Sequence, residues 1–177
     1  MIFIPFVFFK FGQQLAELFS LDRDQLISVI VICGLLFEAM RLKIGFTIFG
    51  QRDYEAHQIS AIAWGLLGIG LILIMAPHQA YVYPLVISLA IGDPLMGEMR
   101  RKGMSSKHVM VYSTLVLWGI WFVCSFLFGT PYWLSFLLAP LCMISEWPRL
   151  SYIDDNATMT LIPLSVILLF EPFIGLL

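Results

Sequence analysis

The chain has 177 residues, of which 60% are hydrophobic and only 12% are charged, and its mean hydropathy is +0.90. Soluble domains are only about half apolar, so this composition excludes a soluble globular protein and predicts an integral membrane protein. The formal net charge of -2 says little about partners, because the charges are sorted by position along the chain.

Seven apolar segments follow one another along the sequence. A membrane-spanning helix needs about 20 apolar residues. The clearest candidates are residues 109–129 and 59–75, and weaker ones are 25–40, 80–91, 131–145 and 157–177. These segments predict an all-α fold, a polytopic transmembrane helix bundle of about six to seven spans with short loops, in one transmembrane domain over residues 1–177.

The first segment, residues 2–20, allows two interpretations. Its polar residues recur at i, i+3, i+4 and i+7 and therefore share one helical face: Lys10, Gln13, Gln14 and Glu17. An amphipathic helix in the membrane interface has such a face, and so does a span whose polar stripe faces a cavity in the bundle. We take the segment as a span, which gives seven helices.

With seven helices, the loops 41–58, 92–108 and 146–156 emerge on the same side of the membrane. Eight of the ten basic residues lie in these loops: Arg41, Lys43, Arg52, Arg100, Arg101, Lys102, Lys107 and Arg149. The positive-inside rule assigns this side to the cytoplasm. We therefore expect a multi-pass protein whose active site faces the cytoplasm.

The segment from residue 92 to residue 103 has the form of a new helix start. Asp93 would be the N-cap and Pro94 the first helical residue, and Gly103 would stop the helix. The basic residues here have the charge density that a polyphosphate needs, beside Glu98: Arg100, Arg101, Lys102 and Lys107. The alternatives are that they anchor anionic lipid headgroups, or that Glu98 and Lys102 form a simple helix-surface pair.

Asp154, Asp155 and Asn156 come directly before the last apolar segment. Any one of them could cap that helix, but two adjacent carboxylates exceed what one cap requires. Mg²⁺ prefers hard oxygen ligands and commonly binds one or two carboxylates together with substrate phosphates. A carboxylate at the membrane surface could also accept the proton of a lipid alcohol. We therefore expect catalytic roles here, with Asp93, Asp154 and Asp155 as candidate metal ligands.

A third charged region covers residues 38–57. Glu38 and Arg41 are one helical turn apart and suit a simple ion pair, and Arg52 follows in the next loop. The span after this loop contains Gly65, Gly68 and Gly70, which predict close packing against a neighbouring helix.

Taken together, these elements resemble the CTP-dependent lipid-alcohol kinases, the family of dolichol kinase, phytol kinase and the CTP-using diacylglycerol kinase of fungi. The resemblance covers residues 35 to 169 and rests on three elements. They are Asp154-Asp155-Asn156 followed by Ile162-Pro163-Leu164, Gly92-Asp93-Pro94 with Gly97, and Glu38-Ala39-Met40-Arg41 followed by residues 52–55 and the glycine-bearing span. The family's Lys-Ser/Thr-x-Glu-Gly element has no counterpart after Asp93.

The resemblance implies a membrane kinase that transfers the terminal phosphate of CTP to a polyprenol, dolichol, phytol or diacylglycerol-type alcohol. It implies Mg²⁺ on Asp93 with Asp154 or Asp155, and a remaining carboxylate near Asn156 that orients or deprotonates the alcohol, with Asn156 itself among the catalytic residues. It also implies phosphate binding by six residues: Arg52, Glu98, Arg100, Arg101, Lys102 and Lys107. The partners would be the lipid alcohol, the nucleoside triphosphate and membrane lipids, with no nucleic acid. The alternatives are a cytidylyltransferase that forms a CDP-lipid and, from another class, a non-enzymatic membrane protein or transporter.

Overall fold

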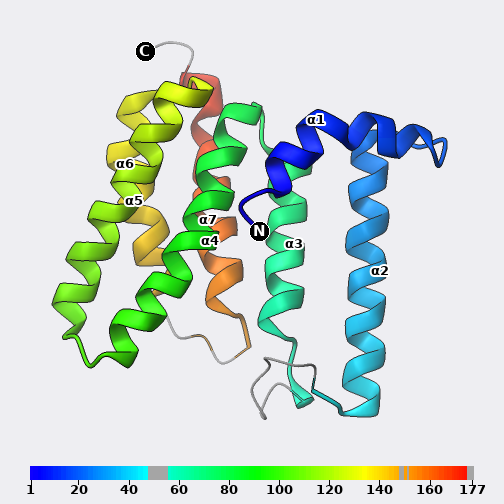
Figure 1. Ribbon diagram of the computed structural model, residues 1–177, viewed down its shortest axis with the longest axis horizontal. Coiled ribbons are helices and arrows are strands. Elements are labelled where there is room, and N and C mark those ends of the chain that lie inside the picture. The colour runs from blue at the N-terminus through cyan, green and yellow to red at the C-terminus, as the bar shows by residue number, and fades with distance from the viewer. Residues whose placement is uncertain (48–55, 148–149, 151, 175–177) are drawn as a thin grey trace.

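The computed structural model describes residues 1–47, 56–147, 150 and 152–174. Within these ranges the protein is all-helical and has no strand, so the predicted all-α class is confirmed (Figure 1). Each predicted apolar segment coincides with one helix. In chain order these are α1 (Ile4–Glu17), α2 (Arg23–Ile44), α3 (Ala61–Met75), α4 (Gln79–Arg101), α5 (Ser106–Phe128), α6 (Tyr132–Glu146) and α7 (Asp155–Ile174).

Three of the described helices are long and apolar enough to cross a membrane. They are α4, α5 and residues Asp155–Phe173 of α7, whereas α3 and α6 are apolar but have only 15 residues each. Large apolar side chains on α5 face outward, among them Val111, Phe122 and Phe126. These findings are consistent with an integral membrane protein, and a bundle of six to seven spans remains a proposal.

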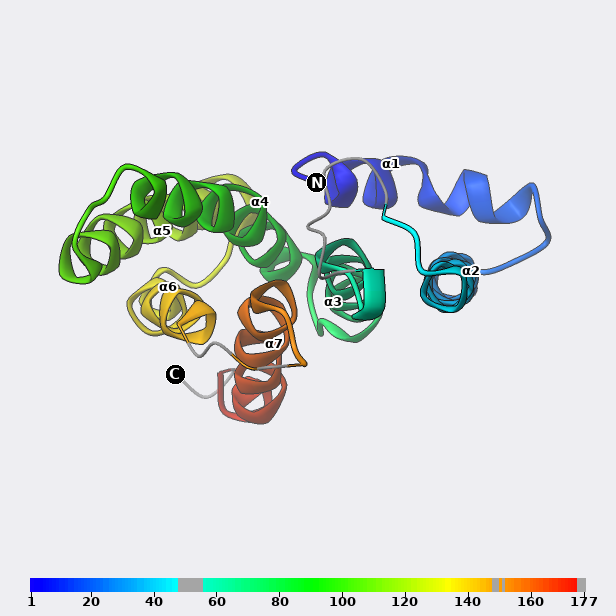
Figure 2. The same ribbon diagram turned by 90° about the horizontal axis from the view of Figure 1, so that it is seen from below.

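Helices α2 to α7 run alternately in opposite directions, as Figure 1 shows. The last residues of α2, α4 and α6 and the first residues of α3, α5 and α7 therefore lie at the same end, which we call the charged end. Seen along the bundle, α7 lies between α3 and α6, with α4 and α5 on one side, and α2 packs on the outer side of α3 (Figure 2). The predicted charged segments thus meet at one end of the bundle.

Helix α1 does not run along the bundle. Its 14 residues measure about 21 Å, which is less than the roughly 30 Å of the hydrocarbon core. Figures 1 and 2 show that it lies across α2 and α3, and the polar residues Lys10, Gln13 and Glu17 are exposed. The expectation that residues 2–20 span the membrane is therefore not supported, because the polar stripe does not face a cavity inside the bundle.

The predicted loop after residue 92 is also corrected. Helix α4 continues through Asp93 and Pro94 to Arg101, so Asp93 is not an N-cap. Pro94 lacks an N–H and leaves the carbonyl of Ala90 without its helical donor, a defect that membrane helices tolerate when their neighbours pack closely. The helix ends where Gly103 adopts a φ of 74° and the N–H of Met104 reaches the carbonyl of Met99 at 3.2 Å, so the predicted stop at Gly103 is confirmed.

Close packing at glycine residues brings neighbouring helices of the bundle together. A side chain at Gly68 of α3 would collide with Thr160 of α7, and one at Gly70 would collide with Val31 of α2. At Gly92 of α4, an added Cβ would lie 2.9 Å from the terminal methyl of Met159. The predicted packing role is confirmed for Gly68 and Gly70, and the absence of side chains brings α3 and α4 against the start of α7.

Candidate functional site

Three carboxylates from three helices meet at the charged end. Asp93 comes from α4, Glu146 is the last residue of α6, and Asp155 is the first residue of α7. Each offers one carboxylate oxygen, and these oxygens lie within 4.8 Å of one another. We call Asp93, Glu146 and Asp155 the acidic group. Its hard oxygen donors fit Mg²⁺, which takes carboxylate ligands in an octahedral shell completed by water or phosphate.

A polar cavity adjoins the acidic group. Its volume is about 540 Å³, and it is lined by Arg100, Met104, Ser106, Glu146, Trp147 and Asp155. The guanidinium of Arg100 donates to both oxygens of Glu146 at 2.6 Å and lies 5.4 Å from the ring centre of Trp147. The cavity therefore places a fixed cation and two carboxylates within one small space, as binding of a metal-bound polyphosphate requires.

A second cavity, which we call the lateral cavity, touches the acidic group at Asp93. Its volume is about 480 Å³, and its walls come from the N-terminal segment and from α3, α4 and α7: Met1, Ile2, Phe3, Ala61, Ile62, Leu89, Ala90, Asp93, Pro94 and Asn156. Among the described residues, only Asp93 and Asn156 bring polar side chains to these walls. Asp93 thus belongs to the acidic group and also lines a mostly apolar cavity.

The three consecutive residues before and within the first turn of α7 have different surroundings. Asp154 precedes the helix and its Oδ1 accepts the backbone N–H of Asn156 at 3.0 Å, which is an N-cap interaction. Asp155 lines the polar cavity. Asn156 is buried, lines the lateral cavity and donates from Nδ2 to the carbonyl of Ala61 at 3.3 Å. Of the two predicted aspartates, only Asp155 is thus a member of the acidic group.

The pKa of Asp154 is raised to about 6, and burial of the carboxyl group is the main cause. The negative charges of Asp155 and Asp93 contribute to the rise, and the hydrogen bond from the backbone N–H of Asn156 opposes it. The carboxyl group of Asp154 is therefore close enough to Asp155 and Asp93 to be affected by their negative charges.

The predicted phosphate-binding residues separate into two sets. Arg100 lines the polar cavity. Arg101 and Lys102 are exposed and form ion pairs with Glu98, at 2.8 Å and 3.5 Å, on the surface of α4. The helix-surface pairing considered for Glu98 and Lys102 is therefore observed. Lys107 is exposed in the first turn of α5 and does not line the polar cavity, and Arg52 lies outside the described residues.

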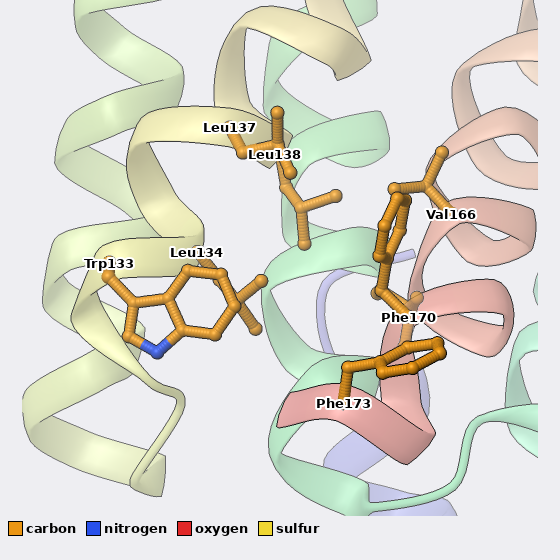
Figure 3. Close-up of a pocket in the computed structure, with 8 residues that line it drawn as sticks. Trp133, Leu134, Leu137, Leu138, Val166, Phe170 and Phe173 are labelled. Carbon is orange, nitrogen blue, oxygen red and sulfur yellow. The ribbon is translucent and has the colours of Figure 1, made fainter. Parts of the chain in front are cut away.

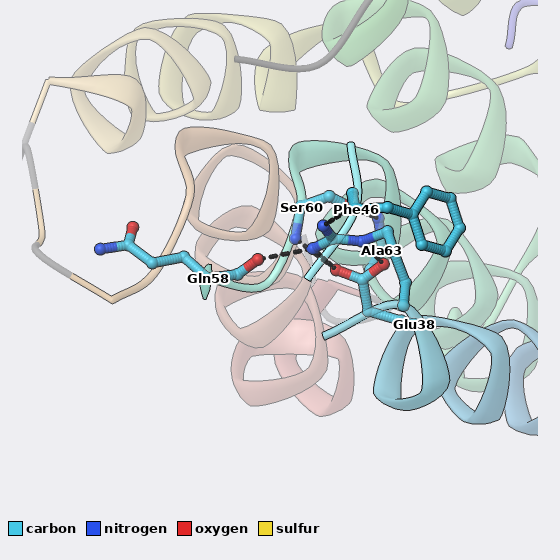
Figure 4. Close-up of polar contacts among 6 residues, drawn as sticks. Glu38, Phe46, Gln58, Ser60 and Ala63 are labelled. Carbon is cyan, nitrogen blue, oxygen red and sulfur yellow. Dashed lines mark hydrogen bonds and ion pairs between the residues drawn. The ribbon is translucent and has the colours of Figure 1, made fainter. Parts of the chain in front are cut away.

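Glu38 and Arg41 form a buried network that joins the last part of α2 to the residues just before α3 (Figure 4). Arg41 donates to both oxygens of Glu38 at 2.9 Å and to the carbonyls of Phe46 and Gln58 at 2.9 Å and 2.7 Å. Glu38 also accepts the backbone N–H of Ser60 at 2.6 Å. The pair suggested by the sequence thus has a structural role, because it positions the start of α3 beside the lateral cavity.

Another pocket lies between α6 and α7 near the opposite end of the bundle (Figure 3). It has a volume of about 200 Å³, and its lining is entirely apolar, with Trp133, Leu138 and Phe170 among its residues. It offers no ionisable group for chemistry, so the polar and lateral cavities are the candidate functional site.

Glu146 is the member of the acidic group that we did not predict as a site residue. The signal in the sequence was its position at the end of an apolar helix, since carboxylates in membrane segments are rare and commonly functional. In the fold its side chain is buried.

Comparison of the chain with protein-family models, curated proteins and solved structures finds no match.

Proposed function

We propose that this protein is a membrane kinase that transfers the terminal phosphate of CTP to a long-chain lipid alcohol. The observation that carries the proposal is the acidic group of Asp93, Glu146 and Asp155 beside a polar cavity that contains Arg100. Carboxylates that bind a divalent cation and an arginine that binds phosphate are the parts that phosphoryl transfer requires. Their location at the end of apolar helices suits a lipid acceptor.

In this proposal the polar cavity receives the nucleotide phosphates. The acidic group would hold Mg²⁺, which supplies charge neutralisation on the phosphate oxygens when it is bound. Arg100 donates hydrogen bonds to phosphate oxygens from the wall of the cavity, in a planar geometry that suits phosphate. Arg101, Lys102 and Lys107 contribute long-range positive charge or bind lipid headgroups, because they are exposed and do not line the cavity.

Transfer requires one bond to form and one to break. The oxygen of the acceptor alcohol bonds to the terminal phosphorus of CTP as the bond from that phosphorus to its bridging oxygen breaks, and CDP leaves. The hydroxyl proton passes to a carboxylate. Asp93 is the candidate base because it belongs to the acidic group and also lines the lateral cavity. By the positive-inside rule, we place this chemistry on the cytoplasmic side.

A transporter is less well supported by the same geometry. Transport sites commonly lie near the middle of the membrane, between broken helices. Here the ionisable groups of the candidate site lie in the second half of α4, at the last residue of α6 and at the first residue of α7. The charge distribution therefore favours chemistry at the membrane surface.

The proposal is tested with purified protein in lipid nanodiscs, Mg²⁺ and CTP that is radiolabelled in its terminal phosphate. A panel of prenyl, phytyl and fatty alcohols and diacylglycerol is supplied, with ATP as the alternative donor. We expect label in the lipid and release of CDP, and loss of both in Asp155→Asn but not in Arg101→Gln. Release of pyrophosphate would instead identify a cytidylyltransferase, and absence of transfer from either nucleotide to any acceptor would refute the kinase.

A further inference from the structure

The lateral cavity has the composition of a site for a small amphipathic ligand. Its volume of about 480 Å³ lies within the range of about 300 to 1,000 Å³ that is usual for ligand sites. Eight of its ten lining residues are apolar or proline, and the two polar side chains, Asp93 and Asn156, come from α4 and α7. A ligand that fits must be apolar over most of its length and polar at one position.

The polar groups beside this cavity accept hydrogen bonds. Asp93 brings a carboxylate, and the amide nitrogen of Asn156 already donates to Ala61. The carbonyl of Ala90, a wall residue, lacks the usual helical donor four residues on, because Pro94 has no N–H. A hydroxyl can donate to such acceptors, whereas an ester or ether oxygen cannot, and a carboxylate or phosphate would be repelled by Asp93.

The rim of the cavity is apolar and exposed. Phe3 has 77% of its surface exposed and Ile62 has 56%, and both line the cavity. In a membrane protein such residues contact lipid chains, so the cavity opens toward the hydrocarbon layer. Its outer wall includes the first three residues of the chain, which precede α1.

We infer that the lateral cavity binds a single-chain lipid alcohol, with its hydroxyl at Asp93 and Asn156 and its hydrocarbon chain between the N-terminal segment and α3. The inference rests on the proposed function, which it deepens by assigning the acceptor site. The placement brings the hydroxyl to Asp93, the member of the acidic group that lines the lateral cavity. Ala61 and Ala90 determine the space for the chain, because their small side chains form the walls beside the polar residues.

The test measures binding and not turnover. The protein in nanodiscs is irradiated with a fatty alcohol that carries a photoreactive diazirine on its chain, and the labelled residues are identified by mass spectrometry. The matching alkane and fatty acid, which carry the same diazirine, serve as controls for the hydroxyl. We expect the alcohol to label Met1 to Phe3 or Ile62, and the two other probes to do so about tenfold less, the effect of losing one hydrogen bond to a charged group.

Ala90→Trp fills the cavity and is expected to abolish this labelling, whereas Ala39→Trp, on the exposed face of α2, should leave it unchanged. Ala61→Trp provides a second blocking variant if Ala90→Trp fails to fold. Equal labelling by all three probes, or unchanged labelling in a folded blocking variant, would overturn the inference.

The acceptor site and the kinase can fail separately. Specific labelling without phosphoryl transfer to any alcohol would retain the site and refute the function. Phosphoryl transfer at the normal rate in Ala90→Trp would retain the function and refute this location for the acceptor.

Discussion

Arg100 and Glu146 form a two-pronged ion pair in which both N–O distances are 2.6 Å, and the two residues come from the ends of α4 and α6. Glu146 is 1% exposed and Arg100 is 32% exposed, so the carboxylate depends on its partner more than the guanidinium does. The same carboxylate belongs to the acidic group. A divalent cation bound at the acidic group would therefore neutralise the same negative charge as Arg100.

The first prediction separates these two sources of positive charge. Arg100→Gln leaves Glu146 beside Asp93 and Asp155 without its cation, and loss of one partner of a buried ion pair costs about 3 to 5 kcal/mol. We expect a lower melting temperature that Mn²⁺ restores to a larger extent than in the unmodified protein, because binding to the folded state stabilises it. Glu146→Gln should weaken the response to Mn²⁺.

The melting temperature of each variant is measured in detergent at a series of Mn²⁺ concentrations. Arg101→Gln is the matched control, since its pair with Glu98 lies on the surface and is worth about 1 kcal/mol or less. Identical Mn²⁺ responses in Arg100→Gln and Glu146→Gln would contradict a shared role for the carboxylate.

The second prediction distinguishes the two aspartates at the start of α7. Asp154→Asn keeps an N-cap of nearly equal strength, so we expect the fold and most of the activity to be retained. Asp155→Asn removes a carboxylate from the acidic group and should abolish phosphoryl transfer while the protein stays folded. Initial rates at saturating Mg²⁺, together with circular dichroism, check both variants, and equal rates would show that the acidic group is not the active site.

The third prediction concerns pH. Asp154 has a pKa of about 6 in the fold against an ordinary value of 3.8, so the folded state binds more protons than the unfolded state between these values. Its contribution to the free energy of unfolding therefore decreases as the pH rises through this window and is least favourable above it. Asp154→Asn should remove this dependence, raising the melting temperature relative to the original protein at roughly pH 8 more than at roughly pH 4. Parallel curves for the two proteins would disprove the shifted pKa.

The helices could be predicted from the sequence because each one is an apolar run that ends at a polar or glycine-containing segment, as α4 does at Gly103. The predicted helix start at Asp93 was wrong because an aspartate followed by a proline is typical of the N-terminus of helices in soluble proteins. Inside a membrane bundle, packing on neighbouring helices outweighs that local signal, and Met96, two residues after Pro94, is fully buried.

The candidate site could be predicted only in part. Charge density identified Arg100, Arg101 and Lys102 together, but adjacent helical residues point about 100° apart, and only the first of them lines the polar cavity. Glu146 was not assigned to the site because its partner Arg100 is 46 positions away in the sequence. Contacts over such a separation depend on how the helices pack.

The fourth prediction tests the contact between α3 and α7. Gly68→Ala should lower stability by about 1 to 3 kcal/mol, because the new methyl group collides with Thr160 and overpacks the interface. Gly119→Ala of α5 has no atom of another residue within reach and should be neutral or stabilising by up to about 1 kcal/mol, since alanine favours helix more than glycine does. Melting temperatures of the two variants compare the sites directly, and a stabilised Gly68→Ala would contradict the close approach.

The fifth prediction concerns the orientation of the bundle. Single cysteines at Ser105 and Tyr152, both exposed at the charged end, should react with an impermeant thiol reagent from the cytoplasmic side only. A cysteine at His78, between α3 and α4, should react from the other side. The native cysteines are first replaced: Cys33, Cys124 and Cys142. Reaction of Ser105 and Tyr152 variants from opposite sides would exclude a common site.

The first two residues of α7 show why their order in the sequence matters chemically. Asp155 contributes to the polar cavity and Asn156 to the lateral cavity, since one step along a helix turns the side chain by about 100°. Exchanging the two would keep the composition and the net charge of the protein. It would nevertheless move a carboxylate from the polar cavity to the lateral cavity, so two chains with identical amino-acid content would differ in how negative charge is divided between the two cavities.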